Sequence, residues 1–132
     1  MSPQDLYGYL PTLPDGDKIV EEAVKYVGVP YVWAGDDPDG FDCSGLALYV
    51  FGRLGVSLQH SSALQATVGF PVAHEELQPG DLLFFYNPVH HVGIYVGNGT
   101  MIDAPESGSY VGLQRVGWSN YTGARRIPLA SP

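Results

Sequence analysis

The sequence predicts an α+β domain in which helices come first and an antiparallel sheet follows. Two observations support this class. In the first half of the chain apolar residues recur at helical spacing, and in the second half the spacing changes to the alternation of β-strands. Turns marked by 17 Gly and 11 Pro among 132 residues separate these segments. We therefore expect one domain, with N-terminal helices packed on an antiparallel sheet of about five strands.

The helical part begins after a segment without periodicity. Residues 1–16 carry three prolines and two glycines, which predicts an extended strap, and residues 17–132 then form the domain. Asp17 caps the first expected helix, which Gly28 and Pro30 end. A second helix has Cys43 in its first turn and stops at Gly55, and a short helix follows Ser61 or Ser62.

The second half of the chain contains five segments with strand-like alternation, separated by turn residues. The first follows the turn formed by Pro79 and Gly80, and the loop Gly97-Asn98-Gly99 joins the second to the third. These segments predict strands at residues 81–86, 90–96, 100–104, 110–116 and 123–127.

The composition excludes several classes of partner and of site. Fourteen acidic against six basic side chains give a net charge of −8, which disfavours binding to nucleic acid and to anionic lipid. No apolar run reaches the ~20 residues of a membrane-spanning helix, so we expect no membrane insertion. The single cysteine rules out an internal disulfide and a zinc site built from several thiolates. We predict neither a metal nor another cofactor.

Cys43 is the strongest candidate for chemistry. Its place at the start of a helix exposes it to unpaired N–H groups and to the positive end of the helix dipole, which favour the thiolate. The small neighbours Ser44 and Gly45 leave room beside the sulfur. A buried structural cysteine is the alternative, but the polar flanks of Asp42 and Ser44 make an apolar pocket a poor fit.

A nucleophilic thiol needs a base, and His91 is the best placed of the four histidines. In the strand at 90–96 the residues Val92, Ile94 and Val96 form the apolar face, and His91 lies on the other face. His90 is expected at the start of the strand, and His74 is expected to be a solvated surface residue.

The turn after this strand identifies a partner for His91. A three-residue loop pairs Ile94 with Ile102 and Gly93 with Asp103, whereas a two-residue turn places Asp103 on the core face. The first register satisfies burial and sets Asp103 diagonal to His91, ~7–8 Å away between backbones. We therefore predict a nucleophile, base and orienting carboxylate formed by Cys43, His91 and Asp103.

These segments resemble the NlpC-type bacterial cell-wall peptidases, a papain-like family of cysteine hydrolases. Four ordered motifs carry the resemblance over roughly residues 17–128. They are Pro30-Tyr31-Val32-Trp33-Ala34-Gly35, Gly40-Phe41-Asp42-Cys43-Ser44-Gly45, Pro79-Gly80-Asp81-Leu82-Leu83-Phe84-Phe85 and His91-Val92-Gly93-Ile94-Tyr95-Val96-Gly97-Asn98-Gly99.

The resemblance implies a papain-like fold and a peptidoglycan endopeptidase in which Cys43 attacks, His91 is the base and Asp103 is the third polar residue. The substrate it implies is the γ-D-glutamyl bond to a diamino acid, meso-diaminopimelate, in a stem peptide that carries a free ammonium and several carboxylates. The resemblance also implies that the substrate contacts Tyr31, Asp42, Ser44 and Ser62, whose positions resemble those of the family's substrate-contacting residues.

The family resemblance further implies an extracellular or cell-wall location and peptidoglycan stem peptides as partners, and we expect a monomer. The N-terminal residues Met1 to Asp5 show no secretory signal. The stretch Gln59-His60-Ser61-Ser62 lacks the arginine or aspartate that many relatives carry there, which leaves the subsite preference open. Two other functions stay open, an acyltransferase or amidase on the same scaffold and a non-catalytic or weakly active module that binds peptidoglycan.

Overall fold

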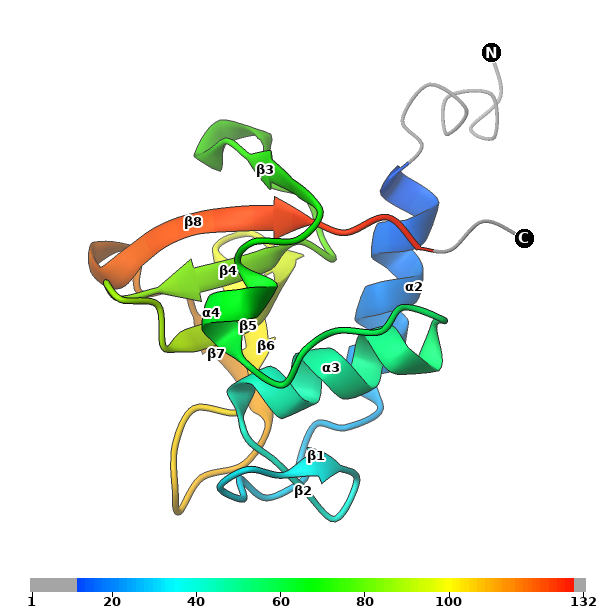
Figure 1. The fold of residues 1–132 in the computed structure, drawn as a ribbon, viewed down its shortest axis with the longest axis vertical. Coiled ribbons are helices and arrows are strands. Elements are labelled where there is room, and N and C mark those ends of the chain that lie inside the picture. The colour runs from blue at the N-terminus through cyan, green and yellow to red at the C-terminus, as the bar shows by residue number, and fades with distance from the viewer. Residues whose placement is uncertain (1–11, 130–132) are drawn as a thin grey trace.

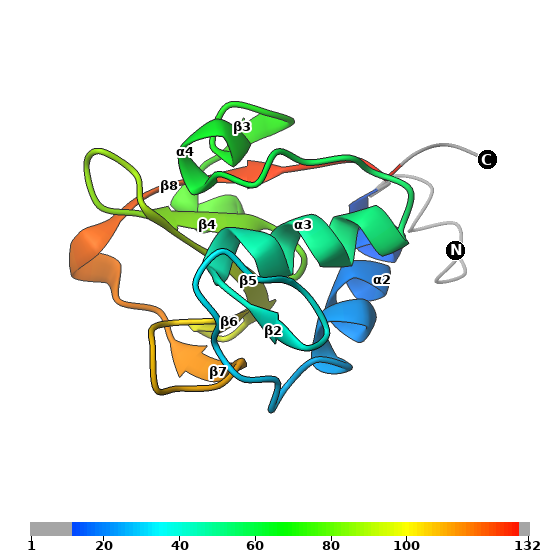
Figure 2. The ribbon, with the colours of Figure 1, turned by 60° about the horizontal axis from the view of Figure 1, so that its bottom comes forward.

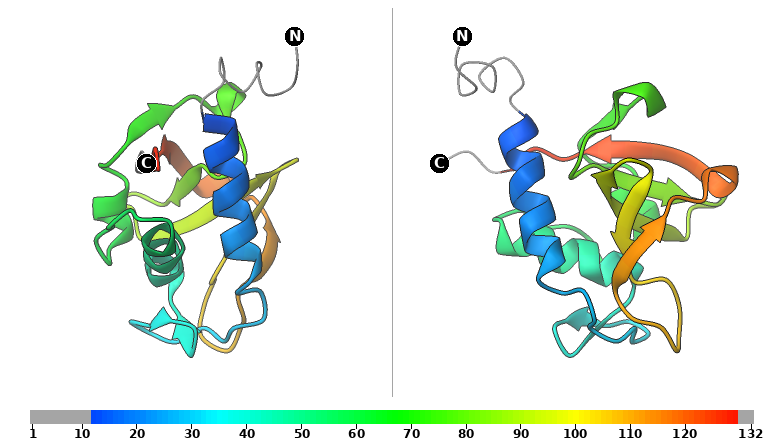
Figure 3. Two further views of the ribbon diagram at one scale, coloured as in Figure 1. Left: turned by 90° about the vertical axis from the view of Figure 1, so that its right-hand side faces the viewer. Right: turned by 180° about the vertical axis from the view of Figure 1, so that it is seen from behind.

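The computed structural model describes residues 12–129, which form three helices and two sheets. The helices are α2 (Thr12–Val24), α3 (Cys43–Arg53) and the single-turn α4 (Ser62–Gln65). Short 3-10 turns follow at His74–Glu76 and Trp118–Asn120. Figure 1 shows α3 in front of the sheet and α2 at its side, and Figure 3 shows that α2 and α3 cross. None of the described helices has the length and apolarity needed to cross a membrane.

The main sheet is antiparallel and has six strands in the order β3-β8-β4-β5-β6-β7. Its strands are β3 (Phe70–Val72), β4 (Leu82–Phe85), β5 (His91–Gly97), β6 (Thr100–Asp103), β7 (Gly112–Arg115) and β8 (Tyr121–Arg126). A separate two-stranded hairpin, β1 (Asp36–Asp37) and β2 (Gly40–Phe41), lies beside the start of α3 (Figure 2). The predicted fold class is confirmed, with six strands where the sequence indicates about five.

The core forms where α2 and α3 pack against the sheet. Ala47 and Val50 of α3 and Ile19 of α2 are buried with Val92 and Ile94 of β5 in one cluster. A smaller cluster on the other face of the sheet holds alternate residues of the same strands, such as Leu83, Phe85 and Met101. Alternation along β4 and β5 therefore separates the two faces, as the sequence pattern predicts.

The first helix starts five residues earlier than the expected cap at Asp17. Residues 12–16 of the expected strap belong to α2, while residues 1–11 lie outside the described part of the chain. Pro14 fits because the N–H groups of a first helical turn have no intrahelical acceptor to lose. Gly16 is needed because a Cβ there would overlap the carbonyl oxygen of Pro79. Gly16 therefore marks a close packing contact, and not a loop.

Two features of the sheet differ from the predicted run of consecutive strands. The last strand, β8, lies between β3 and β4, so the chain returns to the middle of the sheet. The strand β3 was not predicted, because Gly69 and Pro71 look like chain breakers. Proline is tolerated in β3 because this strand lies at the edge of the sheet, where one side of the backbone has no neighbour.

Candidate active site

The start of α3 is held by a cap that presents Cys43. Asp42 precedes the helix in an extended conformation, and its Oδ1 accepts a hydrogen bond from the N–H of Gly45 at 2.7 Å. Its Oδ2 accepts another from the N–H of Ala34 at 3.1 Å. Cys43 is the first residue of the helix and is half-buried, so its thiol lies where the helix dipole is positive.

Gly45 allows this helix start to pack against the loop before it. A Cβ at Gly45 would overlap the carbonyl oxygen of Gly35, an atom of the backbone that cannot move aside cheaply. We expect Gly45→Ala to lower the free energy of unfolding by about 2–3 kcal/mol, measured by urea denaturation. The matched control is Gly52→Ala in the same helix, where a Cβ meets nothing within 4 Å. This control should be neutral or stabilising by ~0.5–1 kcal/mol, and equal losses in both variants would contradict the prediction.

His91 and Asp103 form a buried pair at the first residue of β5 and the last residue of β6. The Nε2 of His91 lies 2.7 Å from Oδ2 of Asp103, whose side chain is 2% exposed. Ile94 pairs with Ile102, as predicted from burial, but the predicted three-residue loop is wrong. Gly97 pairs with Thr100 across a two-residue turn, and an irregularity between Tyr95 and Gly97 shifts the register by one residue, so that Asp103 stays off the core face. Gly93, two residues after His91, makes room for Met101, since a Cβ there would lie 2.5 Å from the Met101 sulfur. The predicted proximity of His91 and Asp103 is therefore confirmed.

His91 also interacts with the sulfur of Cys43. Burial acts to lower the pKa of His91, but hydrogen bonds to Asp103 and Cys43, together with their charges, raise it to about 9. Because Nε2 is bonded to Asp103, Nδ1 is the ring nitrogen that remains for the thiol. The imidazole is therefore protonated at neutral pH and places a positive charge beside the sulfur of Cys43.

All four side chains predicted to contact substrate line one cleft with Cys43. The cleft has a volume of about 400 Å³, and Tyr31, Asp42, Ser44 and Ser62 are part of its wall. Burial, and then the nearby Asp42 and Cys43, raise the pKa of Tyr31 above its ordinary 10.0. The hydroxyl of Tyr31 is therefore neutral at physiological pH and can donate or accept a hydrogen bond in the cleft.

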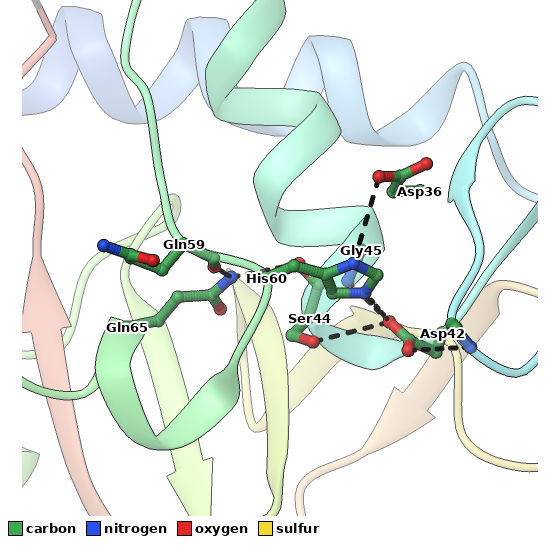
Figure 4. A network of polar contacts seen from close by, with 8 residues as sticks. Asp36, Asp42, Ser44, Gly45, Gln59, His60 and Gln65 are labelled. Carbon is green, nitrogen blue, oxygen red and sulfur yellow. Dashed lines mark hydrogen bonds and ion pairs between the residues drawn. The ribbon is translucent and has the colours of Figure 1, made fainter.

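Ser61 and Ser62 have different roles at the start of α4, since Ser61 caps the helix and Ser62 lines the cleft. Ser61 caps the helix, with its hydroxyl accepting from the N–H of Leu64 at 3.2 Å. Gln65 ties this helix to α3 by donating to the carbonyl oxygens of Ser44 and Gln59 at 3.0 and 2.8 Å (Figure 4). The wall of the cleft that carries Ser62 is therefore fixed to the helix that carries Cys43.

His60 is a cleft residue that the sequence did not single out. Its Nε2 lies 2.8 Å from Oδ1 of Asp42, and its Nδ1 lies 3.9 Å from a carboxylate oxygen of Asp36 (Figure 4). Both oxygens of the Asp42 carboxylate are thus occupied by groups of the chain itself. The one sequence signal for His60 was that residues 59–62 lack the arginine or aspartate that many relatives carry there. The contact with Asp42 could not be predicted, because the two residues lie 18 positions apart in the chain.

Two further residues of the cleft, Trp33 and His90, were also not among the predicted site residues. Trp33 is 81% exposed at the rim. His90 was expected at the start of the strand, but it lies one residue before β5 and stacks on Tyr86 with ring centroids 4.2 Å apart. His74 is exposed as expected, and it stacks on Trp118. Among residues 12–129, no three His, Cys, Asp or Glu side chains form a group that could hold a metal ion.

Comparison with known proteins places this geometry in a family. The NlpC/P60 family matches residues 28–126, which include Cys43, His91 and Asp103. A probable endopeptidase of Mycobacterium tuberculosis is 44% identical over 110 residues, 76% of this chain and 29% of its own length. The probable endopeptidase p60 of Listeria seeligeri is 44% identical over 106 residues, 78% of this chain and 20% of its own length. The chain therefore spans less than a third of these curated relatives.

Solved structures of similar proteins superpose on most of this chain. The NlpC/p60 domain of the peptidoglycan hydrolase SagA superposes with a TM-score of 0.79 and 39% identity, covering 85% of this chain and 98% of that domain. An NlpC/P60 family protein from Bacillus cereus gives a TM-score of 0.81 and 34% identity over 86% of this chain and 40% of that protein. Sequence motifs, fold and comparisons agree, and the chain belongs to the NlpC/P60 family.

Proposed function

We propose that this chain is a cysteine peptidase that hydrolyses the γ-D-glutamyl bond to a diamino acid, meso-diaminopimelate, in peptidoglycan stem peptides. The observation that carries the proposal is the arrangement of Cys43, His91 and Asp103. A thiol at a helix start interacts with an imidazole whose other nitrogen is bonded to a buried carboxylate at 2.7 Å. The family and the names of its relatives, endopeptidase and peptidoglycan hydrolase, support the substrate class.

The proposed first step is acylation of Cys43. The thiolate attacks the carbonyl carbon of the amide, and the resulting oxyanion accepts hydrogen bonds from N–H groups at the start of α3. The N–H of Cys43 is suited to this because the first N–H groups of a helix have no intrahelical acceptor. The His91 imidazolium gives its proton to the leaving nitrogen as the C–N bond breaks, which leaves a thioester on Cys43.

The second step is hydrolysis of this thioester. His91, now neutral, takes a proton from water as the water oxygen attacks the thioester carbon. The C–S bond breaks, the acid is released, and the thiolate and imidazolium are restored. Asp103 holds the ring in one orientation throughout and stabilises its charged form. We place Asp103 as the orienting residue, since its carboxylate touches His91 and not the sulfur.

The cleft favours a polar peptide over a lipid. Its wall contains hydroxyl groups of Tyr31, Ser44 and Ser62, the imidazole of His60 and a carboxylate. A lipid hydrolase or acyltransferase for long chains needs an apolar entrance, whereas here the hairpin of β1 and β2 carries exposed Asp36 and Asp37 beside the start of α3. Tyr31, Ser44 and Ser62 are the residues that we propose as substrate contacts, with Asp42 shaping the cleft through its cap and its bond to His60.

Digestion of defined muropeptides followed by mass spectrometry tests the proposed bond. We expect a diaminopimelate-containing tetrapeptide stem to yield two products, one ending in D-glutamate and one beginning with diaminopimelate. The physical reason is that acyl transfer to Cys43 separates the chain at the attacked carbonyl. A matched stem in which lysine replaces diaminopimelate reports the diamino acid preference. Products cut at any other bond would refute the proposed specificity.

A further inference from the structure

A second hollow adjoins the catalytic cleft. It has a volume of about 370 Å³ and lies over the part of the sheet formed by β3, β8 and β4. Val89 lines both hollows. The short helix α4 supplies Ser62 and Ala63 to the catalytic cleft, and Ala66, the residue that ends α4, lines the second hollow. A peptide held at Cys43 can therefore extend past Val89 into the second hollow.

Arg125 is the only charged residue among those that line the second hollow. Within residues 12–129 its side chain forms no hydrogen bond or ion pair with another residue, although it is half-buried. The next residue, Arg126, differs: its guanidinium bonds both carboxylate oxygens of Asp81, at 2.8 and 2.9 Å. Neighbouring residues of a strand face opposite sides, so Asp81 neutralises Arg126 while Arg125 faces the hollow.

Arg125 is the basic residue that lines the second hollow. A guanidinium recognises a carboxylate by two parallel charge-assisted hydrogen bonds. The wall also has apolar side chains, among them Phe84, Val89 and Ala66, and the hydroxyl of Thr122, which donates to the carbonyl oxygen of Phe84 at 3.2 Å. The hollow thus combines one carboxylate-binding group with a small apolar surface. A terminal alanine, which has a methyl group and a carboxylate, is the simplest peptide residue with both features.

We propose that the second hollow is a subsite for a carboxylate of the bound peptide, with Arg125 as the residue that recognises it. This inference rests on the proposed peptidase function and adds a substrate preference to it. The subsite binds the acidic end of a stem peptide whose scissile bond lies at Cys43. It makes the enzyme favour stems with a free carboxylate over the same stems with that group blocked as an amide.

Two synthetic stem peptides test the subsite. They share a γ-D-glutamyl-diaminopimelyl-D-alanine sequence and end in either a carboxylate or a carboxamide. We expect the wild-type protein to show a kcat/KM about tenfold higher for the carboxylate, and Arg125→Gln to remove this preference, so that its kcat/KM no longer differs between the two peptides. Arg125→Lys should restore part of the preference, because an ammonium keeps the charge without the paired geometry.

Lys18→Gln provides the matched control. Lys18 is an exposed cation of α2 that lines neither hollow, and its loss changes the net charge by the same amount. This variant should keep the tenfold preference of the wild type. An equal kcat/KM for both peptides in the wild type, or an unchanged preference in Arg125→Gln, would overturn the subsite.

A binding measurement separates this result from the peptidase proposal. Calorimetry with Cys43→Ala protein compares the Kd of the two peptides without any cleavage. The carboxylate peptide should bind about tenfold more tightly, and adding Arg125→Gln to this variant should abolish the difference. If the protein cleaves neither peptide but binds with this preference, the subsite stands and the peptidase proposal fails. Equal or absent binding of both peptides refutes the subsite.

Discussion

The Cys43→Ala variant is expected to lose peptidase activity by at least about 10⁴-fold while it keeps its fold. The sulfur forms the covalent bond in the proposed mechanism, so its removal ends acyl transfer and leaves only binding and oxyanion stabilisation. Cys43 is half-buried at the edge of the core, and α3 is capped by Asp42, so the helix does not depend on the thiol. The measurement is kcat/KM on a diaminopimelate stem peptide, with thermal unfolding to check the fold.

Cys43→Ser provides the matched control for this result. A serine hydroxyl preserves size and hydrogen bonding but is far less acidic than a thiol, so it should be nearly as inactive as alanine. More than a few per cent of wild-type activity in the alanine variant would exclude Cys43 as the nucleophile.

The rate of alkylation by iodoacetamide distinguishes an active thiol from one in a non-catalytic module. Because His91→Ala removes the positive charge beside the sulfur, it should slow alkylation of Cys43 near neutral pH. A wild-type thiol that reacts no faster than in His91→Ala would favour the non-catalytic alternative.

The second large effect is expected from Asp103→Asn, in the pH dependence of activity. The hydrogen bonds of His91 to Asp103 and Cys43 overcome burial and raise the pKa of His91 to about 9. Loss of the Asp103 charge should lower this pKa toward the ordinary value of 6.5, so the alkaline limb of kcat/KM moves to lower pH. At neutral pH we expect a loss within the roughly 10²–10⁴-fold that general acid–base catalysis contributes.

Asp103→Asn should also lower the free energy of unfolding, most strongly at the pH values where the His91 imidazole of the wild type is protonated. A folded-state pKa raised above its unfolded value stabilises the fold fully below about pH 6.5, and this contribution is lost as the pH rises through about 9. The difference in unfolding free energy between wild type and Asp103→Asn should therefore shrink between these values. The exposed Asp17 provides a control, since Asp17→Asn should move neither the alkaline limb nor this difference. An alkaline limb unchanged in Asp103→Asn would show that Asp103 does not set the ionisation of His91.

Local sequence was sufficient for the parts of the site that lie on single elements or adjacent strands. Asp42, Cys43 and Gly45 lie within four residues of one another at the start of α3. Their order alone is enough to predict the helix cap, the candidate nucleophile and the open space beside it. The pairing of Ile94 with Ile102 follows from the alternation of apolar residues, because only this register keeps Asp103 off the core face. The predicted loop length was wrong, since an irregularity between Tyr95 and Gly97 combines with a two-residue turn to give the same register. The proximity of His91 and Asp103 could therefore be predicted from the sequence alone.

Contacts between segments far apart in the chain could not be predicted from the sequence. His60 reaches Asp42 because α4 packs beside α3, and Arg125 reaches the second hollow because β8 inserts between β3 and β4. Glycine and proline signals near Gly16 and Pro71 mark tight packing and a sheet edge, which only the assembled fold distinguishes from loops. Periodicity and caps are set by neighbours a few residues apart, so the sequence determined which elements carry Cys43 and His91. The order of the strands depends on burial among segments far apart in the chain, and the tertiary structure therefore decided which other side chains share the cleft.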